Sequence, residues 1–173
     1  MRALLLLMLT ACLSGPTAAR PSEQAVAADA PPATAWAALA GTWRGSGEVR
    51  GMAAEVTLEF RESLGGRGRH LRFENLMRGE DSQAWPFRAE ALYLCDPAGA
   101  CRGHWYDSRG MVLPLAATAT PDRVVVDWGD ADTERGRTTY ALTGNQLRIT
   151  DEVLGKDGVW KVFGRTVARR TSD

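Results

Sequence analysis

The side chains in this sequence that are best suited to bind a metal are carboxylates and histidines, and their spacing predicts no metal site. Four carboxylates fall within eight residues, at Asp127, Asp130, Asp132 and Glu134. Their oxygens would suit Ca²⁺, but the spacing and the final glutamate of an EF-hand loop are absent, so we expect a solvated loop. Of the two histidines, His70 lies among arginines and His104 stands alone in a predicted strand. We expect both to be ordinary polar residues.

Patterns that mark catalysis are also absent. The sequence contains no G-x-S-x-G nucleophile elbow, no H-E-x-x-H zinc helix and no Walker loop. The glycine-rich stretch at residues 65–68 is not followed by a helical pattern that could receive a phosphate, so it is expected to be a turn. We therefore predict no catalytic residues, and an enzyme is the less favoured alternative.

Two of the three cysteines are close in sequence and predict a disulfide. Cys95 and Cys101 flank residues 96–100, whose Asp, Pro and Gly are typical of a turn. An even pair in an exported protein is expected to be oxidised and to pin the ends of a hairpin. A zinc site would need more Cys or His nearby, and a redox pair usually has two residues between its cysteines.

The N-terminus has the pattern of an export signal. A positive start at residues 1–2 precedes an apolar run that is too short to span a membrane as a stable helix. The segment LTAC at residues 9–12 resembles the lipobox of bacterial lipoproteins, which would acylate Cys12, whereas residues 17–19 fit ordinary cleavage and a soluble exported form. We expect a signal at 1–12, a disordered tether at 13–33 rich in Ala, Pro, Ser and Thr, and one domain at 34–173. This organisation predicts a location on the periplasmic side of the bacterial envelope, with a lipid anchor favoured.

The charge balance excludes some classes of partner. Lys and Arg total 21 and Asp and Glu total 21, so the formal net charge is zero. A neutral chain offers no electrostatic surface for nucleic acid or for an anionic bilayer. We expect no nucleic-acid partner, and contact with a membrane only through the N-terminal lipid.

Apolar residues of the domain alternate with polar ones at a period of two, which predicts strands with one buried face. Ala54, Val56, Leu58 and Phe60, for example, alternate with charged residues and a threonine. Turn signals separate about ten such segments. They are 42–50, 53–63, 69–78, 87–94, 101–108, 111–117, 123–128, 137–143, 146–154 and 158–169.

The connections between these segments are short, so we expect every neighbouring pair to be antiparallel. Closure into an up-and-down barrel would remove the two free edges of such a meander, whereas a sandwich would need a longer Greek-key connection. The fold class predicted is an all-β, closed, up-and-down antiparallel barrel of about ten strands. One short N-terminal helix at residues 34–39 is expected to fill its base with Trp36 and Leu39.

Inward-facing positions of this barrel combine rings with a few polar groups, as small-molecule pockets do. The candidate ligand-binding residues are Phe73, Asn75, Tyr93, Trp105 and Tyr140. Small barrels can also fill with side chains and bind nothing, and that alternative stays open.

The opening of the first strand resembles a known superfamily. Residues 40–47, AGTWRGSG, resemble the G-x-W start of the calycin barrels, and more specifically nitrobindin-like and bacterial lipocalin-like domains. The resemblance implies that Trp43 packs across the barrel floor beneath an arginine of the last strand. Arg165 and Arg169 are the candidates, and we expect Arg169, because the start of the first strand should meet the end of the last.

The same resemblance implies a haem bound through a histidine near the C-terminus. This sequence has no histidine after His104, so haem is not predicted from the matching position and the cofactor stays unassigned. We expect an envelope barrel that binds a small hydrophobic molecule. The alternatives are a filled barrel that acts as a scaffold or binds a partner protein, and a haem-binding nitrobindin-like protein.

Overall fold

The computed structural model describes residues 35–81 and 83–172. The expected signal peptide, Cys12 and the tether at 13–33 lie outside the described residues and stay predictions. The elements are α1 (Ala35–Leu39), β1 (Gly41–Val49), β2 (Met52–Ser63), a 3₁₀ turn η1 (Leu64–Gly66), β3 (Gly68–Arg78), β4 (Ala84–Cys95), β5 (Cys101–Asp107), β6 (Val112–Ala119), β7 (Arg123–Trp128), β8 (Gly136–Thr143), β9 (Gln146–Leu154) and β10 (Trp160–Arg170).

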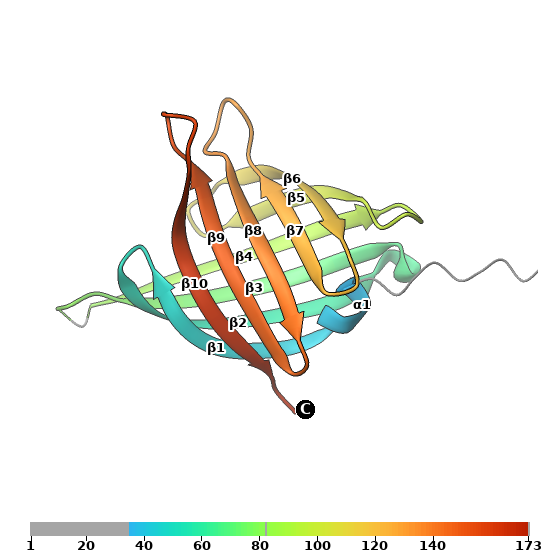
Figure 1. Cartoon of the computed structure of the whole chain (residues 1–173), viewed down its shortest axis with the longest axis horizontal. Helices are drawn as coiled ribbons and strands as arrows, with labels where there is room; N and C mark the ends of the chain where they lie inside the picture. The colour runs from blue at the N-terminus through green and yellow to red at the C-terminus, as the bar shows by residue number, and fades with distance from the viewer. Residues whose placement is uncertain (1–34, 82, 173) are drawn as a thin grey trace, which may run out of the picture. The chain divides into compact units, whose positions relative to one another are not determined.

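The ten strands form a closed barrel in which each strand pairs with its neighbours in the chain and β1 pairs with β10 (Figure 1). Every pair is antiparallel. The predicted up-and-down barrel is confirmed, and the sandwich alternative is wrong. Closure removes the two free edge strands that an open meander would have, which is why a meander of short connections is stable in this form.

Most strand boundaries lie within two residues of those predicted, and the start of β4 is the main difference. It begins at Ala84 rather than at residue 87, with Pro86 inside it. A proline cannot donate a ladder hydrogen bond and is tolerated where a strand is paired on one side. Pro86 pairs with Leu76 on β3, while the pairing with β5 begins only at Ala89.

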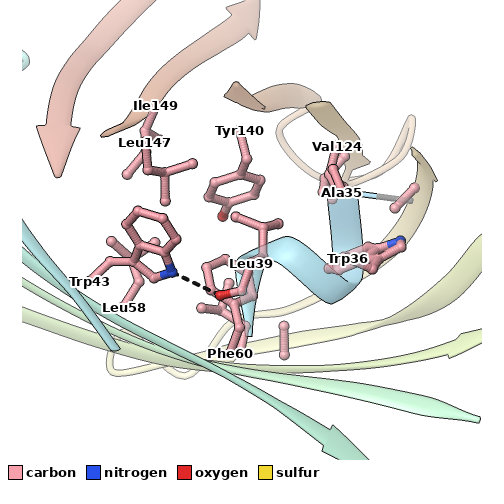
Figure 2. Packing of buried hydrophobic residues seen from close by; sticks show 14 of the residues in the cluster. Ala35, Trp36, Leu39, Trp43, Leu58, Phe60, Val124, Tyr140, Leu147 and Ile149 are labelled. Atoms are coloured by element: carbon pink, nitrogen blue, oxygen red, sulfur yellow. Dashed lines mark hydrogen bonds between the residues drawn. The ribbon is translucent and has the colours of Figure 1, made fainter. Parts of the chain in front are cut away.

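One end of the barrel is packed solid by α1, as predicted, and is called here the helix end. The backbone N–H of Ala35 donates to the carbonyl of Thr120 at 2.8 Å, which ties α1 to the loop before β7. Trp36 and Leu39 are buried, and Figure 2 shows them between side chains that arrive from the barrel wall. Trp43 is fully buried, and its indole N–H donates to the carbonyl of Leu39 at 2.8 Å.

The arginine over Trp43 is Arg170, so the expectation of Arg165 or Arg169 is corrected. The guanidinium carbon of Arg170 lies 4.4 Å from the ring centroid of Trp43, and its nitrogens donate to the carbonyls of Ala38 and Ala40. Trp43 pairs with Arg170 in the β1–β10 ladder. Arg165 and Arg169 occupy the alternate positions of β10 and are exposed, because successive side chains of a strand point to opposite faces.

The predicted disulfide between Cys95 and Cys101 is present. The two cysteines pair directly in the β4–β5 ladder at the helix end. The intervening turn is closed by hydrogen bonds between Asp96 and Ala100, one from each backbone N–H at 2.9 Å. The bridge therefore locks a hairpin that its own turn already orders.

Reduction of the disulfide is expected to destabilise the barrel by about 2 kcal/mol without unfolding it, because the closed loop is short and constrains little chain entropy. Thermal melts with and without reductant measure the difference. The double variant Cys95→Ala/Cys101→Ala is the control and should not respond to reductant. Superimposable melts of the parent protein would show that the bridge contributes nothing.

Candidate functional site: a cavity opposite the helix

The end of the barrel opposite α1 contains a cavity of about 290 Å³. Because the strands run up and down, this end gathers the last residues of β1, β3, β5, β7 and β9 and the first residues of the other strands. Six aromatic side chains line the cavity, Phe73, Phe87, Trp105, Trp128, Tyr140 and Phe163. The site is therefore an apolar chamber above a packed floor, the arrangement typical of small-molecule pockets.

The aromatic side chains support one another in two groups. Trp105 on β5 lies near Phe73 and Phe87, with ring centroids 5.9 and 6.3 Å apart. Trp128 meets Phe163 edge to face at 6.4 Å. A Cβ at Gly136 would lie 1.9 Å from the Trp128 ring, so only glycine lets that ring lie across β8. Such contacts pre-form the walls.

A chain of hydrogen bonds ends on a carboxylate inside the barrel. The indole N–H of Trp128 donates to the hydroxyl of Thr138 at 3.2 Å, and that hydroxyl donates to Asp151 Oδ1 at 2.7 Å. Desolvation raises the pKa of Asp151 to about 6, although the bond from Thr138 acts in the opposite direction. Asp151 is thus ionised at neutral pH in a site that disfavours its charge.

The backbone of β10 makes room for this carboxylate. The β9–β10 register shifts between Val162 and Gly164, and Asp151 pairs with Gly164. A Cβ at position 164 would lie 2.9 Å from Asp151 Oδ2. The bulge and the glycine together let the acid side chain turn inward beside the strand.

Two further polar residues of the lining are buried. Asn75 is 6% exposed, and its Oδ1 has no hydrogen-bond partner within residues 35–81 and 83–172. Tyr140 is 5% exposed, and burial, chiefly, raises the pKa of its hydroxyl well above 10. Within the described residues, the lining thus includes a buried amide oxygen that makes no hydrogen bond.

Charged residues from three loops meet at the mouth of the cavity. Arg109 bonds Asp107 at 2.7 Å and Glu134 at 3.1 Å, and Arg50 approaches Glu134 at 4.0 Å. Burial acts to raise the pKa of Asp107, but hydrogen bonds from Arg109 and Trp105 outweigh it and the pKa is lowered. Glu134 is therefore not merely a solvated loop acid, as its run of carboxylates suggested, but links the two arginines.

Four of the five predicted ligand-binding residues line the cavity, namely Phe73, Asn75, Trp105 and Tyr140. Tyr93 does not. It is 1% exposed and packs against Trp36, with ring centroids 5.2 Å apart. Its position late in β4 places it at the helix end, where α1 covers it.

Asp151, Thr138 and Trp128 were not among the predicted site residues. The signal for Asp151 was present, since it shares the inward parity of Leu147, Ile149 and Val153 in β9. A carboxylate at an inward position breaks the apolar alternation. Only the fold shows that this break faces an empty space rather than a packed core.

The lining does not supply the imidazole that the haem resemblance implies. His104 is exposed on β5, and His70 lies 3.2 Å from Glu90 outside the cavity. The described part of the chain also holds no group of three His, Cys, Asp or Glu side chains placed to bind a metal. These residues do not fit a histidine-ligated haem.

Fold and cavity define the class as a closed ten-stranded up-and-down β-barrel with one plugged end. No protein-family profile and no curated protein matches the sequence. Among solved structures 17 chains match, including the crystal structure of Rv2717c from M. tuberculosis. That chain is 14% identical with a TM-score of 0.55, and the match covers 78% of this chain and 93% of that one. At this identity the likeness shows the fold.

Along the described residues, none of the helices has the length and apolarity needed to cross a bilayer.

Proposed function

We propose that this barrel binds a small, predominantly apolar molecule in the cavity opposite α1. The observation that carries the proposal is the cavity itself, about 290 Å³ within walls of six aromatic side chains. A cavity with apolar walls and few polar groups gives affinity through burial and orientation through the polar groups. The packed floor of Trp43, Leu39 and Trp36 closes the far end, so a ligand would enter through the mouth.

We further propose that the protein is a calycin-like barrel of the bacterial envelope. The AGTWRGSG start at residues 40–47 and the Arg170 contact with Trp43 support the affiliation. A structural disulfide supports an oxidising compartment, in keeping with the export signal and with Cys12 as the lipid attachment site. Loss of lipid labelling in a Cys12→Ser variant would test the anchor.

Filling the cavity should abolish ligand binding. Val56 lines the cavity from β2 and is 4% exposed. Val56→Phe is expected to weaken binding of the neutral dye N-phenyl-1-naphthylamine by about tenfold or more, because the added ring occupies the ligand's space. Fluorescence titration at neutral pH measures the affinity.

The matched control is Val167→Phe, the same change at a 43% exposed position on β10, and it should bind the dye as the parent does. Native mass spectrometry of protein from its own envelope would show a bound molecule directly. If the parent protein binds no dye and its native mass spectra show no bound molecule, the ligand proposal fails and the scaffold alternative is favoured.

A further inference from the structure

The wall of the cavity carries a half-buried carboxylate without a counter-charge. Asp151 lines the cavity, and the only hydrogen-bond partner of its carboxylate in the described chain is the hydroxyl of Thr138. Among described residues, no Lys, Arg or His forms an ion pair with it. A carboxylate among apolar walls is destabilised unless a cation or several donors accompany it. Among the described residues that line the cavity, Asp151 is the one carboxylate without an ion-pair partner.

The cations of the cavity are at the mouth and are already neutralised. Arg109 is paired with both Asp107 and Glu134, and Glu134 also faces Arg50. Each guanidinium further lies 5.5 Å from an aromatic ring centroid, Arg109 over Phe87 and Arg50 over Phe163. The unpaired charge of the cavity is therefore the negative one of Asp151, and it would repel an anionic ligand.

The remaining walls suit a positive group as well. Aromatic faces attract cations, and the chamber is lined by six aromatic rings. Asn75, also in the lining, holds a carbonyl oxygen that has no partner in the described structure. The cavity thus offers two acceptors, the Asp151 carboxylate and the Asn75 carbonyl, together with several rings. The Thr138 hydroxyl is not free to donate to a ligand, because it already donates to Asp151.

We propose that the ligand of this cavity is an organic ammonium with an apolar body, which donates hydrogen bonds from its nitrogen to the carboxylate of Asp151. This inference rests on the proposed ligand-binding function and specifies its ligand class. A cavity of about 290 Å³ is roughly twice one that holds benzene, so an amine with one or two rings fits.

The pH dependence of amine binding follows from the groups around Asp151. Its pKa of about 6 means that it is ionised above that pH, and affinity for an ammonium should fall by about tenfold per pH unit below it. On β8 it faces Thr138 and Tyr140, whose raised pKa keeps the phenol neutral. The β10 residues that face it, Gly164 and Thr166, carry no charge. Arg137 and Glu152 are charged but lie on the outer faces of β8 and β9. The charges at the mouth, Glu134, Arg50 and Arg109, are paired with one another.

The test uses three probes that share one tail, 3-phenylpropylamine, 3-phenylpropanol and 3-phenylpropanoate. Calorimetric titration of the full chain at pH 7.5 compares them. We expect the amine to bind about tenfold or more tightly than the alcohol, and the carboxylate to bind most weakly. Asp151→Asn should remove the preference for the amine over the alcohol.

Glu152→Gln is the matched control, the next residue of β9 on the opposite face, and it should retain the preference. If Asp151→Asn does not fold, the pH profile of amine binding to the parent protein decides the same point. Equal affinity for amine and alcohol, or a preference that survives Asp151→Asn, would overturn the ammonium inference while the ligand proposal stands. Absence of binding by all three probes in a protein that binds the dye would overturn the ammonium inference alone, and absence of dye binding as well would overturn both.

Discussion

Trp43→Ala should lower the free energy of unfolding by about 3–5 kcal/mol, the range for a large aromatic deleted from a core. Trp43 is completely buried, with 0% of its surface accessible. It packs among Leu58, Leu147 and Leu39 (Figure 2). Leu58 and Leu147 sit on strands held by continuous ladders, so they cannot move in to fill the space. The carbonyl of Leu39 would also lose its donor.

Chemical denaturation of the parent and variant measures the loss. Trp85→Ala is the control, because Trp85 is 50% exposed on β4 and its removal should cost less than about 1 kcal/mol. A cost below about 1 kcal/mol for Trp43→Ala would show that the floor is not a structural core.

Arg170 should couple to Trp43 in a double-mutant cycle by about 0.5–1 kcal/mol, the value of a cation over an indole at an exposed site. Arg169→Ala should show no coupling, since that side chain lies on the outer face of β10. Coupling through Arg169 instead would contradict the observed register.

Asp151→Asn should raise the free energy of unfolding by about 2–3 kcal/mol above pH 7. The pKa of Asp151 is about 6 in the folded barrel against 3.8 for the ordinary group, and each unit corresponds to about 1.4 kcal/mol. Between pH 4 and pH 6 the folded protein binds more protons than the unfolded chain, so the stability of the parent falls as pH rises through this window. Above this pH window, the whole stability difference of about 2–3 kcal/mol has been lost from the parent protein.

The asparagine variant lacks this titration, so the two proteins should be about equally stable near pH 4 and diverge up to pH 7. Denaturation midpoints across this range measure the divergence. Asp107 titrates in both proteins, and its effect cancels in the comparison. A difference that does not vary with pH would show that Asp151 is not desolvated. A stability gain with a loss of amine preference would identify a carboxylate retained for function.

Much of the barrel could be predicted from the sequence because strand alternation has a period of two and reports burial directly. In β2 the inward residues Ala54, Val56, Leu58 and Phe60 are all buried. Short connections then allow only antiparallel neighbours, and closure follows because ten open strands would leave two edges. The hairpin disulfide was equally local, since its two cysteines and their turn lie within seven residues.

The wrong choice of arginine over Trp43 comes from the strand register, in which a difference of one residue is decisive. The expectation that the start of β1 meets the end of β10 is confirmed, but Trp43 pairs with Arg170 rather than with Arg169. A shift of one residue moves a side chain to the other face of a strand, so an approximate register cannot choose between adjacent arginines. The register shift at Val162 and Gly164 is invisible in the alternation on either side of it.

The sequence alone determined which residues face inward, because alternation is a local property of each strand. It did not determine which inward residues pack and which line a space. Tyr93 and Tyr140 have the same alternation, yet α1 covers Tyr93 and leaves Tyr140 beside the cavity. Likewise, only the closed barrel shows that Asp151 faces apolar walls without a cation, since its neighbours there come from β7, β8 and β10. Charge and solvation at a site depend on everything that surrounds it, and that is settled by the tertiary structure.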